Sequence, residues 1–204
     1  MNGQMMKQKT LLAALLMVII LCAIPSNTYA GTSSFRAWGG GVWLHDDIKD
    51  YDIKYRTGYG YGASYGTSWF CYLRTEIEVF YLHNTIKELK VDSQPLGITG
   101  SIDNYGALFN LALECPFTLS KMKLCPYIGA GFGASHSKSK LHIGTFPVQK
   151  EAQRSFSQQY FGGISFPIFP FFIGEISANV EGRYYVFDKH AHAVLAIGGI
   201  ALKF

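Results

Sequence analysis

Residues 69 to 82 read WFCYLRTEIEVFYL, with apolar and polar side chains alternating along the segment. The odd-numbered positions form one mainly apolar set, while Arg74, Glu76 and Glu78 lie in the middle of the other. A β-strand sends successive side chains to opposite faces, whereas a helix would scatter both sets around its axis. The pattern therefore predicts a long strand with one apolar face and one ionic face.

The same alternation recurs along the rest of the chain. In residues 171 to 187, Glu175, Glu181 and Arg183 share a polar face opposite an apolar one. Weaker segments of the same kind cover residues 34–44, 56–66, 101–114, 124–135, 155–166 and 192–204. Long polar connections at 45–55, 83–100 and 136–154, with a short polar one at 188–191, alternate with tighter turns such as Thr67-Ser68. This organisation predicts an all-β fold, an eight-stranded antiparallel up-and-down β-barrel, whose apolar face could point either inward or toward lipid.

The chain of 204 residues is 49% hydrophobic, 15% aromatic and only 16% charged, which excludes disorder and coiled coils. Residues 1–30 have the pattern of a signal peptide, with Lys7 and Lys9 before an apolar stretch and cleavage expected after Ala30. Residues 31–204 then form one barrel domain. Without the two signal lysines, 16 basic residues face 14 acidic ones, so the net charge is +2 and no nucleic-acid partner is expected.

The distribution of lysine decides which face of the strands points outward. Of the lysines after residue 30, only Lys203 lies inside a predicted strand. A soluble barrel would place lysine on its outward face, where water solvates it. The polar face instead carries small residues and a few charges, which suits a narrow interior. We therefore expect the apolar face to contact lipid, which makes the barrel an eight-stranded antiparallel up-and-down transmembrane β-barrel.

Four pieces of sequence resemble the small eight-stranded bacterial outer-membrane β-barrels of the opacity and surface-antigen type. They are Arg74-Thr75-Glu76-Ile77-Glu78, Pro126-Tyr127-Ile128-Gly129-Ala130-Gly131, the FSQQYFGG segment from Phe156 to Gly163, and the terminal Phe204. The resemblance implies residence in the bacterial outer membrane and a surface protein acting in adhesion or in envelope integrity. It also implies that Phe204 is the terminal signal read by the outer-membrane assembly machinery.

Eight strands enclose a space that side chains can fill, so the ionic residues should meet inside the barrel. Because unpaired buried charge is costly, we expect one salt-bridge network that plugs the lumen. Its predicted members are Arg74, Glu76, Glu78, Glu114, Glu175, Glu181 and Arg183. A small-solute channel is the alternative to a plugged interior.

The cysteines left after signal removal are Cys71, Cys115 and Cys125. Cys115 and Cys125 flank one turn, and export permits oxidation, so a disulfide between them is expected. Cys71 could stay free, pair with another chain or compete for Cys115.

All six histidines, His45, His83, His136, His142, His190 and His192, fall in or beside the four long connections at one end, which should be extracellular. No metal-ligand spacing is present, so neither a metal nor a cofactor is expected. The segment from Ser135 to Arg154 is basic and could contact lipopolysaccharide phosphates or an acidic host glycan, or could simply be a solvated tip. Expected partners are thus outer-membrane lipids, lipopolysaccharide and a possible host or surface ligand.

A lipid A-modifying enzyme is the remaining alternative. A deacylase of this size would need a His, Ser and acidic trio on the lipid-facing wall, and no such nucleophile and base can be read from the chain. We therefore expect a protein that is not an enzyme.

Overall fold

The computed structural model describes residues 31–46, 51–69, 72–91, 94–96, 98–119, 122–143, 146–172, 174–187 and 191–204. The predicted signal peptide and Cys71 lie outside these residues. Eight long strands form the wall: β1 (Thr32–Asp46), β3 (Gly58–Trp69), β4 (Leu73–Val91), β6 (Ile98–Glu114), β8 (Met122–Ile143), β9 (Phe146–Phe171), β10 (Gly174–Val186) and β11 (Ala191–Lys203). Three short strands extend the sheet: β2 (Tyr51–Tyr55) and β5 (Gln94–Leu96) on β4, and β7 (Phe117–Leu119) on β8.

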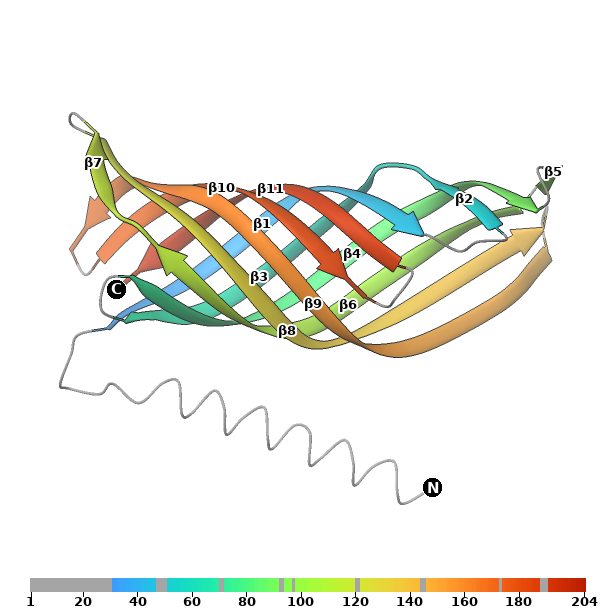
Figure 1. Ribbon diagram of the computed structural model, residues 1–204, viewed down its shortest axis with the longest axis horizontal. Helices are drawn as coiled ribbons and strands as arrows, with labels where there is room; N and C mark the ends of the chain where they lie inside the picture. The colour runs from blue at the N-terminus through green and yellow to red at the C-terminus, as the bar shows by residue number, and fades with distance from the viewer. Residues whose placement is uncertain are drawn as a thin grey trace, which may run out of the picture.

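The eight long strands close into one antiparallel barrel. Each pairs with its neighbours in sequence, and β1 pairs with β11 through partners such as Gly40 and Ile197. Figure 1 shows the tilted strands and the C terminus at one end, here called the turn end. At that end the backbone groups of Phe204 and Ser33 exchange two hydrogen bonds of 2.9 Å. The predicted fold class is confirmed. Within the described residues, no helix has the length and apolar character needed to cross a membrane.

All three predicted long connections are wrong, because most of their residues lie in strands; in 45–55, the end of β1 and the whole of β2 do so. β4 runs to Val91, and β8 and β9 form one long hairpin that leaves only residues 144 and 145 between them, at the opposite, loop end. These extensions carry polar side chains on both faces, so their sequence shows no alternation of apolar and polar residues. Backbone pairing with the neighbouring strand nevertheless continues, because it does not depend on the side chains.

The predicted turn at Thr67-Ser68 is also misplaced. Both residues belong to β3, and the turn follows Trp69, whose carbonyl oxygen accepts a hydrogen bond from the Tyr72 amide at 3.2 Å. The indole of Trp69 also donates to the Thr75 hydroxyl at 3.0 Å, which ties the ends of β3 and β4 together. Trp69 therefore ends β3 instead of beginning β4.

The apolar face of the strands points outward and the ionic face inward. Large apolar side chains that are exposed on the wall include Val79, Leu113, Ile128, Phe156, Ile164, Val180 and Ile200. In contrast, Arg74 and Glu78 are 1% and 0% exposed. Because water would not favour so broad an apolar surface, the outer face is suited to hydrocarbon.

The barrel interior has two layers, of which the sequence predicted only one. Polar and ionic side chains fill the half nearer the turn end. An apolar cluster fills the half nearer the loop end, and its members are Trp38, Val42, Leu44, Phe80, Leu82, Leu108, Tyr185, Phe187, Ala193, Leu195 and Ile197. Gly62 makes room for this cluster, since a Cβ there would lie 2.5 Å from the Trp38 ring and 2.6 Å from the Val79 carbonyl oxygen.

Candidate functional site

Arg183 is the centre of the ionic layer in the lumen. Its guanidinium contacts Glu78 on β4, across the barrel, and Glu181 on its own strand. It also donates to the Tyr185 hydroxyl at 3.2 Å and stacks 4.5 Å from the centre of the Trp38 ring. A guanidinium suits this position because it offers several donors in one plane and an apolar face for an aromatic ring.

A second arginine centre lies nearer the turn end. Arg74 contacts Glu114, and its Nε lies 3.1 Å from a carboxylate oxygen of Glu76. Arg36 approaches the same Glu76 oxygen at 4.0 Å from β1. Both guanidinium groups face the Tyr127 ring, at 5.1 Å for Arg36 and 4.8 Å for Arg74.

Neutral side chains connect these two centres. The Asn110 amide donates to Glu78 at 2.8 Å, and Gln159 donates to the Asn110 oxygen at 2.6 Å. The Tyr127 hydroxyl donates to Glu181 at 2.7 Å. The charges of Arg183, Glu78 and Glu181 are thus paired and hydrogen-bonded, which is the condition under which buried ions are tolerated.

The structure brings six of the seven predicted interior residues into this layer. Glu175 is the exception: it lies at the turn end, 35% exposed, with its carboxylate 3.9 Å from the Lys203 amine. Sequence reasoning missed Arg36, Asn110, Tyr127 and Gln159. All four take inward positions, so strict alternation within each predicted strand could have found them. Three of the four are uncharged, however, and a search for charged residues on the polar face does not select them.

The expected disulfide between Cys115 and Cys125 is not formed in the structure. Both are free thiols, Cys115 exposed and Cys125 half-buried. The Cys115 amide bonds the Pro126 carbonyl oxygen at 2.9 Å, so the register is one residue away from pairing the two cysteines. Neighbouring positions on a strand point to opposite faces, which directs the two side chains apart.

Two cross-strand rows on the outer wall carry polar chemistry that the sequence did not reveal. The first row runs over five strands, from β3 to β9, through Tyr61, Tyr81, Tyr105, His136 and Arg154. The next row toward the loop end contains Tyr59, His83, Asp103 and Lys138. Lys140 follows one position further along the outer face of β8.

Close contacts join the members of these rows. The Asp103 carboxylate accepts from the Tyr81 hydroxyl at 2.7 Å and lies 2.7 Å from Nδ1 of His83. The Lys138 amine lies 5.1 Å from the centre of the Tyr105 ring. The Tyr59 ring lies 5.1 Å from the His83 ring. The rows therefore form one continuous aromatic and ionic band, here called the outer band.

The other histidines do not form a metal site in the part of the chain that the structure describes. His45 and His192 stack with their ring centres 5.3 Å apart, on the outer face of β1 and β11. No group of three His, Cys, Asp or Glu side chains among the described residues is arranged to hold a metal ion. The side chains of His142 and His190 lie outside the described set.

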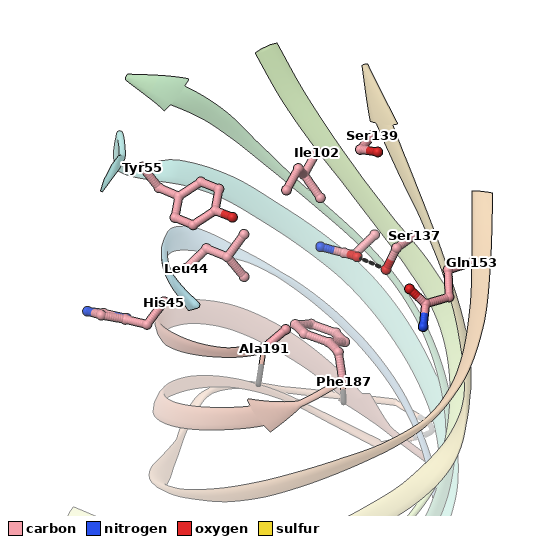
Figure 2. A pocket seen from close by; sticks show the side chains of 10 residues that line it. Leu44, His45, Tyr55, Ile102, Ser137, Ser139, Gln153, Phe187 and Ala191 are labelled. Atoms are coloured by element: carbon pink, nitrogen blue, oxygen red, sulfur yellow. Dashed lines mark hydrogen bonds between the residues drawn. The ribbon is translucent and has the colours of Figure 1, made fainter. Parts of the chain in front are cut away.

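A cavity opens at each end of the lumen. The one at the turn end has a volume of about 420 Å³ and is lined by residues that include Glu114, Cys125 and Lys203. The one at the loop end is smaller, about 170 Å³, and is shown in Figure 2. The ionic layer and the apolar cluster lie between them and fill the barrel.

Removing one member of the central ion pair should destabilise the barrel strongly. We expect Glu78→Ala to lower the free energy of unfolding by about 3–5 kcal/mol, because Arg183 stays buried without its carboxylate. Urea unfolding of the refolded protein in lipid vesicles measures this. Glu175→Ala is the matched control, and at this half-exposed rim position a loss of about 1 kcal/mol or less is expected. Equal losses in the two variants would contradict the assigned role of the pair.

The chain was compared with known proteins in sequence and in structure. No protein-family model matches the chain, and no curated protein matches it in sequence. Solved structures do match. They include Ail, the attachment invasion locus protein of Yersinia pestis, in complex with the heparin analogue sucrose octasulfate, with a TM-score of 0.54 and 15% identity over 85% of this chain and 99% of that one.

Two further structures are similar. Neisserial surface protein A has a TM-score of 0.57 and 16% identity over 86% of this chain and 100% of that one. The outer membrane protein OprG from Pseudomonas aeruginosa has a TM-score of 0.50 and 10% identity over 86% and 97% of the two chains. With its closed wall and apolar outer face, the chain has the fold of the small eight-stranded bacterial outer-membrane β-barrels.

Proposed function

We propose that this protein is a non-conducting outer-membrane barrel that stabilises the envelope by holding anionic lipid headgroups on its outer band. The observation that carries the proposal is the register of the wall. Lys138, Lys140 and Arg154 follow each other on the outer face of β8 and β9, beside the tyrosine row and beyond the apolar wall. Cations at that height would meet the phosphates of lipopolysaccharide.

The tyrosine row supports the placement of these cations at the level of the lipid headgroups. Aromatic residues concentrate where hydrocarbon gives way to headgroups, because their rings are apolar and their hydroxyls are polar. Below Tyr81 and Tyr105 the exposed side chains of the same strands are apolar, as at Val79 and Leu111. The cations at and beyond this row would thus lie at the level of the headgroups.

The charges of the outer band favour an anionic ligand. Three fixed positive charges, on Lys138, Lys140 and Arg154, face one carboxylate, Asp103, which leaves a net charge of +2 on these described positions. The Asp103 carboxylate already accepts a hydrogen bond from Tyr81 and contacts His83. Each basic residue near an anionic membrane surface contributes about 1 kcal/mol of binding free energy.

A second candidate function, adhesion to another surface, is favoured by the length of the β8–β9 hairpin. β8 has 22 residues and β9 has 26, whereas about 9–11 residues cross a membrane as a strand. The hairpin would therefore project well beyond the lipid. That Ail was solved with a heparin analogue is consistent with a surface role for barrels of this shape.

Delivery to the outer membrane is proposed to depend on Phe204. Its side chain is half-exposed at the end of β11, where the outward residues are apolar, as in Ile200 and Leu202. An exposed terminal aromatic on an amphipathic last strand is accessible to the assembly machinery.

Neutralising the outer band should weaken the interaction with lipid A phosphates. We expect the triple variant K138Q/K140Q/R154Q to bind bisphosphorylated lipid A roughly a hundredfold more weakly, since three charges contribute about 1 kcal/mol each. The measurement is the rise in melting temperature of the detergent-refolded barrel as lipid A is added.

Two controls accompany this test. Lys123→Gln removes a lysine at the turn end, away from the outer leaflet, and should leave lipid A binding unchanged. Dephosphorylated lipid A should stabilise the wild type no more than it stabilises the triple variant. If the triple variant binds bisphosphorylated lipid A as the wild type does, the proposed headgroup contact is wrong.

Planar-bilayer recording tests the plugged interior. We expect no steady unitary current from the wild-type barrel, because the ionic layer and the apolar cluster fill the lumen. A sixteen-stranded porin inserted under the same conditions gives the positive control. Large, stable current steps from this protein would favour the small-solute channel instead.

The proposal assigns no enzymatic activity to the chain. The His83–Asp103 pair on the lipid-facing wall has two parts of a hydrolytic trio. Within the described residues, the side-chain contacts of His83 are with Asp103 and the Tyr59 ring, and neither is a hydroxyl nucleophile of the serine kind. We expect an unchanged lipid A mass spectrum when the protein is expressed in a strain that lacks it. A shift in acyl or phosphate mass that disappears in H83A would establish the enzyme alternative.

A further inference from the structure

We propose that the cavity at the loop end of the lumen binds a single uncharged pyranose residue of a surface glycan. The cavity has a volume of about 170 Å³, a little more than the roughly 150 Å³ of a closed protein cavity that holds benzene, so a pyranose ring can enter it with some of its hydroxyl groups left at the mouth. It is open toward the loop end and closed below by the apolar cluster, to which Leu44 and Phe187 belong. This inference concerns the lumen, so it does not depend on the outer band.

One wall of the cavity is built for hydrogen bonding. Asn104 on β6, Ser137 on β8 and Gln153 on β9 occupy one cross-strand row, and Ser139 follows on β8. The Ser137 hydroxyl donates to the Asn104 side-chain oxygen. Figure 2 shows Ser137, Ser139 and Gln153 together on one side of the cavity. Hydroxyls and amides in such a row can each donate and accept, as the hydroxyls of a sugar require.

The opposite wall is apolar and partly aromatic. Leu44 and Tyr55 face the polar wall across the cavity, and Phe187 and Ala191 lie between the two sides (Figure 2). Ile102 lies beside Ser139, its cross-strand partner, at the edge of the polar wall. A pyranose ring has one face of C–H groups, which packs against apolar side chains and the electron-rich face of an aromatic ring. The polar and apolar walls of the cavity therefore match the hydroxyl groups and the C–H face of the sugar.

The residues that line the cavity also favour a sugar over other small ligands. A purely apolar molecule would leave the amides and hydroxyls of the polar wall without partners, which costs free energy. Among the described lining residues, a charged molecule would find no carboxylate, lysine or arginine, since nine of the ten are uncharged and the tenth is His45. The ring of His45 is directed toward the rim in Figure 2. An uncharged ligand with several hydroxyl groups fits best.

Saturation-transfer NMR on the barrel refolded in lipid nanodiscs tests the proposal. The probes are the methyl glycosides of glucose, galactose and mannose, with glucuronate and cyclohexanol as charged and apolar comparisons. At least one neutral glycoside should show saturating, competable transfer, whereas glucuronate and cyclohexanol should show little. Absence of transfer to all three glycosides would overturn the proposal, as would equal binding of cyclohexanol.

Variants then place the sugar in the cavity. Q153A/S139A should weaken glycoside binding about thirtyfold, because two hydrogen bonds of about 1 kcal/mol each are lost. Neither side chain is fully buried, so the fold should be kept. Phe187→Ala should also weaken binding, and its folding is checked by the heat-modified mobility of the barrel on gels. Thr85→Ala is the control: this side chain is exposed on the outer face of β4, outside the cavity lining, and the variant should bind as the wild type does. Equal weakening in Thr85→Ala and Q153A/S139A would overturn the assignment.

The glycan that supplies the sugar can come from the bacterium or from a contacting cell. Competition of the bound glycoside by the purified O-polysaccharide, or by neutral oligosaccharides from epithelial cells, distinguishes these sources. Competition by either one that is lost in Q153A/S139A supports the proposal. Failure of both to compete would show that the cavity does not take a sugar carried on a glycan.

Discussion

The structure depends on one constraint, which is that a β-sheet in hydrocarbon cannot leave its edge strands unpaired. Lipid offers no hydrogen-bonding partners, so β1 must pair with β11 and the sheet must close. Closure at eight strands fixes a narrow lumen. Every inward side chain then has to find a partner inside it. The contact between Arg183 and Glu78 across the barrel and the packing of Trp38 over Gly62 both follow from this narrowness.

The lumen divides into an ionic half and an apolar half, and this division gives the two ends different chemistry. The ionic half is rigid because its charges are held by paired groups from several strands, such as Arg74 with Glu114. The apolar half closes the loop-end cavity from below, and the described residues that line the cavity include no carboxylate, lysine or arginine. A barrel that is filled along its length can still present a small, specific concavity to the outside.

The outer wall and the lumen use alternate residues of the same strands. On β8, His136, Lys138 and Lys140 face outward, while Ser135, Ser137 and Ser139 face the lumen. In sequence this segment reads as a polar loop, since neither face is apolar. Because it pairs with β9 as a strand, it has a cationic outer face and a hydroxyl-lined inner face. The outer face carries the proposed contact with lipid headgroups, and the inner face carries the proposed contact with a sugar.

The sequence by itself determined the barrel, its inside and outside, and most of the ionic layer, because period-two alternation specifies which face each residue takes. It misplaced the ends of β4, β8 and β9 and it suggested a disulfide that the register excludes. Only the tertiary structure decided the loop-end cavity, the outer band and the apolar cluster. These combine residues from up to seven separate strands and segments, and which residues meet depends on cross-strand register, which alternation within one strand does not encode.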